Sequence, residues 1–165
     1  MLHLMRHTQP PAQRGQAIVE FALVAPILII LIMGVFDLGL AFFTNITLQN
    51  AAREGARYAT QHVIAAQAQA QLLMERVNEE LKAGRVHEPG VNLVCPNYPA
   101  SPFVCQTGDG ATTVTYRCDA IYANTMQCRS GTGVSVVIIR HYHSLFDFVL
   151  PGSFDLRSDA TFRMP

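Results

Sequence analysis

The sequence predicts an α+β protein in which a long N-terminal transmembrane helix and a second amphipathic helix precede a small antiparallel sheet. Three observations lead to this class: an uncharged apolar run over 21–36, helix-forming residues with four-residue periodicity over 63–82, and many Gly, Pro, Thr and β-branched residues after Gly90. A helix that precedes several short strands is expected to pack on one face of their sheet. One anchor in 165 residues leaves about a hundred for a single small domain.

The apolar run is long enough to cross a bilayer. Extending it to Phe43 includes a single charge, Asp37, and gives 23 residues from Phe21, or about 35 Å at helical rise. A hydrophobic helix of about 20 residues spans the hydrocarbon core. We therefore expect a transmembrane and assembly helix at 16–60 and an extracytoplasmic α+β domain at 61–165. Residues 1–15 contain two arginines and no acid, which predicts a cytoplasmic leader.

Glu20 stands at the head of the apolar run. A carboxylate at the edge of the hydrocarbon costs a few kcal/mol, so it is usually kept near the headgroups or paired. Cleavage after Gly15 would create a partner, because the new α-amino group of Gln16 would lie one helical turn from Glu20. Gly15 is followed by four residues, then Glu20 and Phe21. This order therefore indicates a site of proteolytic processing whose product can use Glu20 in subunit assembly.

Asp37 is the second acid of the apolar segment. Its position is near the outer membrane boundary. We expect a solvated carboxylate at the helix end, and the alternative is a partner for an arginine of a neighbouring chain.

Small residues recur on one face of the continuing helix. They are Ala51, Ala52, Gly55, Ala56 and Ala59. Such a stripe allows two helices to approach closely and is most useful in or near a membrane. Arg53 and Arg57 share an adjoining face, where Glu54 is within reach of Arg57. We interpret the stripe and these arginines as a helix-packing surface, with an ordinary solvated face as the alternative.

Two motifs in this segment resemble a known family. The sequences RGQAIVEFALVAP at 14–26 and AAREGARYA at 51–59 look like those of the TadE-like pseudopilins of bacterial tight-adherence (Flp) pili. The resemblance covers roughly residues 14–60, and the rest of the chain shares only the broad layout of pilin-like subunits. It implies that a prepilin peptidase cuts after Gly15 and that the chain is a minor pseudopilin required for assembly of a tight-adherence (type IVb/Flp) pilus. Gln16 stands where type IV pilins generally have Phe.

The same resemblance implies the partners and the location. The partners would be prepilin peptidase, other pilins or pseudopilins, the pilus assembly machinery and the membrane. The protein would cross the bacterial inner membrane once, with a cytoplasmic N-terminus and a periplasmic or extracellular C-terminal domain, or associate with the pilus. Two alternatives remain: a passively anchored binding or sensing module, and a secreted enzyme released by signal peptidase near Ala41.

The second helix and the strands are expected from periodicity and turn residues. Leu73, Val77 and Leu81 recur every four positions within a helix expected at 63–82, and Gly84 is a plausible end signal. Continuity between the two helices is left open. Strands are expected at 91–94, 112–117, 134–142 and 154–162, separated by glycine-containing turns.

All four cysteines lie after residue 94. An even number on the far side of the anchor predicts disulfides in an oxidising compartment. Zinc is the alternative, but zinc sites prefer closely spaced cysteine pairs. We expect sequential pairing, Cys95 with Cys105 and Cys118 with Cys128, because it closes two short loops; two other connectivities are possible.

The sequence offers no catalytic pattern. Twelve basic residues balance twelve acidic ones, so no nucleic-acid partner is expected. It has no phosphate-binding loop, zinc-protease motif or nucleophile elbow, and we expect neither an enzyme nor a cofactor. His141 and His143 would share one face of a strand, but no nearby sequence supplies further metal ligands, so we expect a surface pair.

Overall fold

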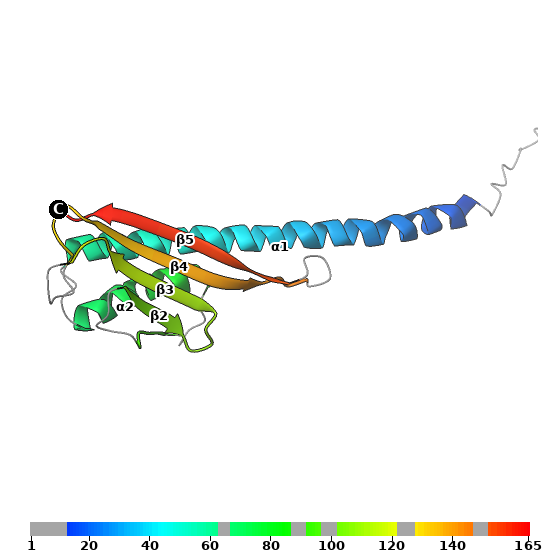
Figure 1. The fold of residues 1–165 in the computed structure, drawn as a ribbon. Coiled ribbons are helices and arrows are strands. Elements are labelled where there is room, and N and C mark those ends of the chain that lie inside the picture. Colours follow the sequence, from blue (N-terminus) through cyan, green and yellow to red (C-terminus); the bar gives the residue numbers. More distant parts are fainter. Residues whose placement is uncertain (1–12, 63–66, 87–91, 97–101, 122–127, 147–151) are drawn as a thin grey trace, which may run out of the picture.

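The protein has two helices followed by five strands. The structure, a computed structural model, describes residues 13–62, 67–86, 92–96, 102–121, 128–146 and 152–165. The elements are α1 (Gln13–Gln61), α2 (Gln67–Ala83), β1 (Leu93–Val94), β2 (Phe103–Thr107), β3 (Thr112–Cys118), β4 (Gly133–His143) and β5 (Ser153–Arg163). The N-terminal half of α1 projects far beyond the rest of the molecule (Figure 1). The predicted α+β class is confirmed.

The strands form one antiparallel meander in the order β1-β2-β3-β4-β5. The longest ladder joins β4 to β5 and extends from Gly133 opposite Arg163 to His143 opposite Ser153. This hairpin lies alongside α1, and β4 runs toward the projecting half of the helix (Figure 1). The chain ends at the other end of the domain.

Strand β2 was not among the predicted strands. Phe103, Cys105 and Thr107 are buried and alternate with the more exposed Val104 and Gln106, which is the pattern of a half-buried strand. The pattern covers only five residues directly after Pro102, so it is weak when read alone. Pairing with β3, in which Cys105 lies opposite Val114, decides the conformation.

The hydrophobic core lies between one face of the sheet and the two helices. Its largest fully buried side chains include Leu48 of α1, Leu73 of α2, Phe103 of β2, Tyr116 of β3 and Ile138 of β4. The second half of α1 is therefore part of the folded domain. Helices α1 and α2 are separate elements, and residues 63–66 between them lie outside the described residues.

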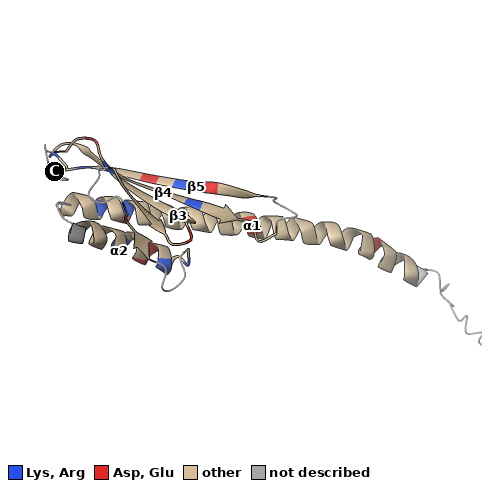
Figure 2. Cartoon of the chain, turned by 60° about the horizontal axis from the view of Figure 1, so that its bottom comes forward, with Lys and Arg blue, Asp and Glu red and all other residues tan. Residues whose placement is uncertain are grey.

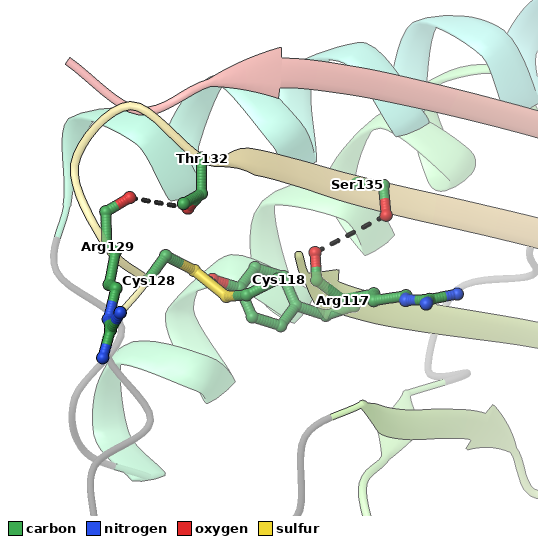
Figure 3. The surroundings of a disulfide bond; sticks show 7 residues. Arg117, Cys118, Cys128, Arg129, Thr132 and Ser135 are labelled. Carbon is green, nitrogen blue, oxygen red and sulfur yellow. Dashed lines mark hydrogen bonds between the residues drawn. A yellow bond between two sulfur atoms is a disulfide. The ribbon is translucent and has the colours of Figure 1, made fainter. Parts of the chain in front are cut away.

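Two disulfides connect neighbouring parts of the sheet. Cys95, just after β1, is bonded to Cys105 of β2. Cys118 at the end of β3 is bonded to Cys128, shortly before β4 (Figure 3). The pairing is sequential, and the described residues contain no free cysteine.

Candidate functional site

The projecting half of α1 is an exposed apolar rod. The structure has one described helix that is long and apolar enough to cross a membrane, and none of its most apolar 18-residue window is buried. Large side chains such as Ile18, Phe21 and Val35 are exposed all around it, and it is almost free of charge (Figure 2). Exposing apolar surface to water costs about 25 cal/mol per Å², so this surface requires lipid or protein around it.

The head of the rod contains the expected processing and assembly residues. Gly15, Gln16, Glu20 and Phe21 are all exposed within α1. The side-chain amide of Gln16 donates a hydrogen bond of 3.0 Å to the carboxylate of Glu20. These two residues therefore lie one turn apart on the same face. A Cβ added at Gly15 would meet no atom within 4 Å, so the chain around this glycine is open to another protein.

Asp37, at the base of the rod, attaches α1 to the end of the β4–β5 hairpin. The expectation that its carboxylate is solvated is wrong. Asp37 is fully buried. Its carboxylate accepts hydrogen bonds from the Ser144 hydroxyl, from the Leu145 N–H at 3.1 Å and from the Tyr142 hydroxyl at 3.3 Å. A buried charge is tolerated only when its oxygens are satisfied in this way.

The donors around Asp37 come from the end of β4 and the residues after it. The Phe146 N–H donates to the Ser144 hydroxyl oxygen at 3.1 Å, which orients this hydroxyl toward Asp37. Burial, followed by the charge of Asp37 and the hydrogen bond to it, raises the pKa of Tyr142. The phenol therefore stays protonated and able to donate. These contacts attach the hairpin end to α1 where the helix leaves the domain.

The small residues of α1 lie inside the protein's own core. Ala51, Ala52, Gly55, Ala56 and Ala59 are buried. A Cβ added at Gly55 would lie 2.5 Å from Val77 of α2 and 3.5 Å from Val136 of β4. The stripe allows α1 to approach α2 and the sheet closely within the same chain. It is therefore not available to a helix of a neighbouring subunit.

The two arginines beside the stripe are exposed. Arg57 lies 3.9 Å from Glu54, with both side chains largely in solvent, and a pair of this kind contributes little to stability. Arg53 also faces solvent. Both remain accessible to a partner.

The strand histidines are exposed and have different partners across the β4–β5 ladder. His141 is exposed and hydrogen-bonded to Asp155 across the β4–β5 ladder, while His143 lies opposite Ser153. No group of three or more metal-ligating side chains occurs among the described residues.

Sequence reasoning missed the three donors to Asp37. They follow it by 105 to 108 positions, so no local spacing connects them. The available signal was the acid itself, because a carboxylate within an apolar helix needs specific partners.

One comparison with known proteins matches the segment that contains the rod from Gly15, its base and all of the small-residue stripe except Ala59. A family model described as TadE-like protein matches residues 15–57, which confirms the resemblance inferred from the motifs. The matched family is a family of pilus components. No curated protein and no solved structure matches significantly. Within the described residues α1 is the one helix apolar and long enough to span a bilayer, which is the feature expected of a single-pass membrane anchor.

Proposed function

We propose, from the TadE-like match of residues 15–57, that this chain is a minor pseudopilin required for assembly of a tight-adherence pilus. The observation that carries the proposal is the exposed apolar rod of α1 with a carboxylate at its head. A rod of this kind serves two environments in turn: lipid before assembly and the apolar helices of other subunits afterwards.

Partner choice within the membrane requires more than apolar surface. Lipid tails are as apolar as a neighbouring helix, so association depends on packing and polar pairing. The small-residue stripe is buried within its own domain, which leaves the exposed part of α1 and Glu20 for this role. After cleavage behind Gly15, the new amine of Gln16 would pair with Glu20 of its own chain or of a neighbour.

The proposal includes processing and orientation. A prepilin peptidase cuts between Gly15 and Gln16, and the leader remains in the cytoplasm. The chain crosses the bacterial inner membrane once, and its domain lies in the periplasm or outside the cell. The two disulfides support an oxidising compartment for that domain.

The described fold disfavours release by signal peptidase. Cleavage before Phe42 would remove Asp37 and leave the Tyr142 hydroxyl, the Ser144 hydroxyl and the Leu145 N–H without their common acceptor. A passively anchored binding module would keep Asp37. It remains the alternative, and it predicts no cleavage.

N-terminal sequencing of the protein purified from membranes tests the proposal. Gln16 as the first residue is expected, whereas Met1 would support the passive anchor and Phe42 the secreted form. Gly15→Leu should abolish the cut. Gly39→Leu is the matched control, since it introduces the same side chain at another α1 glycine with no atom within 4 Å of an added Cβ. Processing that is unaffected by Gly15→Leu would contradict the proposed site.

A further inference from the structure

The end of the β4–β5 hairpin lies beside α1 where the apolar rod begins (Figures 1 and 2). We call its described residues, 144–146 and 152–154, the hairpin tip. The Ser144 hydroxyl and the Leu145 N–H bind the carboxylate of Asp37 directly. The position of the hairpin tip along the axis of α1 is therefore fixed at Asp37.

That height coincides with the expected outer boundary of the bilayer. A helix from Ile18 to Asp37 extends about 30 Å, which is the thickness of the hydrocarbon core. If the span begins instead after Glu20, the boundary lies about one turn beyond Asp37. In both cases the folded hairpin tip is level with the region where hydrocarbon meets headgroups.

The surface of the tip suits this position. Leu145 is 62% exposed and Phe154 is 42% exposed, and the described tip residues are uncharged, while the sequence places one acid, Asp147, between them outside the described residues. On α1, Leu38, Phe42 and Phe43 continue the exposed apolar surface past Asp37. The nearest described titratable groups on the hairpin are Tyr142, which lies opposite Phe154, and His143; the hydrogen-bonded pair of His141 and Asp155 lies one step further from the tip on the same face as His143. Amphipathic elements that lie at a membrane surface have this distribution of apolar and polar groups.

We propose that the hairpin tip and the adjoining turns of α1 insert into the outer interface of the bilayer. The partner is a lipid surface, and the domain touches it at a second point beside the spanning helix. Asp37 joins the spanning helix to the hairpin tip. Contact of both with lipid would therefore fix the tilt of the domain relative to the membrane before assembly. This inference rests on the membrane anchor of the proposed function.

The test uses the absence of tryptophan from the chain. Leu145→Trp and Phe154→Trp each introduce a single reporter into the full-length protein, reconstituted in phosphatidylcholine–phosphatidylglycerol vesicles containing a phospholipid brominated near the upper acyl chain. Phe162→Trp is the matched control: it is 41% exposed and is on the same face of β5 as Phe154. It lies eight positions further along the strand, which is about 27 Å. Ile30→Trp reports on the span itself.

Insertion of about 5–10 Å predicts that the bromolipid removes about half of the emission at positions 145 and 154 but leaves position 162 unchanged. If Ile30→Trp is quenched while both tip reporters are not, the tip does not touch lipid and the inference is wrong, although the anchor stands. If Ile30→Trp is also unquenched, the anchor itself fails. Unquenched tip emission that shifts to the blue as the protein-to-lipid ratio rises would assign the tip to a second copy and would also overturn the inference. Far-UV circular dichroism of every variant checks folding.

Discussion

The hydroxyl of Tyr142 lies 3.3 Å from both the carboxylate and the main-chain carbonyl oxygen of Asp37, although 105 positions separate the two residues. The contact joins the sheet to the point at which α1 leaves the domain. A helix that projects from a fold has its direction set by the last contacts it makes there. Asp37 and the end of β4 therefore determine the direction of the apolar rod relative to the domain.

Asp37→Ala should destabilise the folded domain. The substitution leaves the part-buried Ser144 hydroxyl and Leu145 N–H without their acceptor, while the Tyr142 hydroxyl keeps only the main-chain carbonyl of residue 37, and each unsatisfied buried group costs about 1–3 kcal/mol. Urea unfolding of the full chain in detergent micelles, followed by circular dichroism, measures the loss. The control is Asp159→Ala, at an exposed position of β5. Equal stability of the two variants would show that Asp37 does not hold the hairpin.

Gly55→Ala should also destabilise the protein. Its new methyl group would lie 2.5 Å from a methyl of the buried Val77, and overpacking of this kind costs about 1–3 kcal/mol. Gly39→Ala adds the same methyl group to the same helix where no atom lies within 4 Å, and should leave stability unchanged or raise it by up to about 1 kcal/mol. Parallel unfolding curves measure both effects. If Gly55→Ala impairs pili while leaving unfolding unchanged, the stripe acts between subunits after all.

Glu20→Leu should separate processing from assembly. The variant is expected to insert and to be cut after Gly15, yet to fail in pilus formation, because the Gln16 amine then has no fixed counter-charge at the edge of the hydrocarbon; breaking such a pair costs several kcal/mol. The measurements are the size of the membrane-bound protein and the surface pili of cells lacking the native copy. Gln16→Ala is the control, since it removes the side-chain hydrogen bond to Glu20 and keeps the amine. Normal pili in the Glu20→Leu strain would contradict the proposed role of this carboxylate in assembly.

Stability should fall in alkaline solution because of Tyr116. Burial raises the pKa of this tyrosine to about 12, and its hydroxyl lies 2.9 Å from the sulfur of Cys128. The unfolded state ionises near pH 10 while the folded state stays protonated, so the contribution is complete below pH 10 and is lost as pH rises toward 12. The loss from pH 9 to pH 11 is about 1 kcal/mol. Unfolding curves at the two pH values measure it, and Tyr116→Phe should remove this part of the dependence. A wild-type slope retained in Tyr116→Phe would assign the effect to other groups.

Much of the architecture could be predicted because it depends on local pattern. The apolar run after Glu20, extended past Asp37 to Phe43, is long enough to cross a membrane. The repeat of Leu73, Val77 and Leu81 indicated an amphipathic helix, and these residues are buried in α2. Strands β3 and β4 were recognisable from runs of β-branched residues bounded by turn residues, and β5 was delimited by the turn residues Pro151 and Gly152 before it. The segment that the TadE-like family model matches, 15–57, contains the motifs at 14–26 and 51–59 except for their outermost residues, 14, 58 and 59.

What the tertiary structure decided depends on partners distant in sequence. Five residues of β2 become a strand because β3 pairs with them. The small residues around Gly55 suit a close helix contact, but their spacing is the same whether the facing surface is Val77 of the same chain or another subunit. A carboxylate at the end of an apolar run is compatible with solvent as well as with burial, and only the fold places the end of β4 around Asp37. Sequence determines which groups need partners through their charge, size and periodicity, whereas the partner itself is set by chain topology.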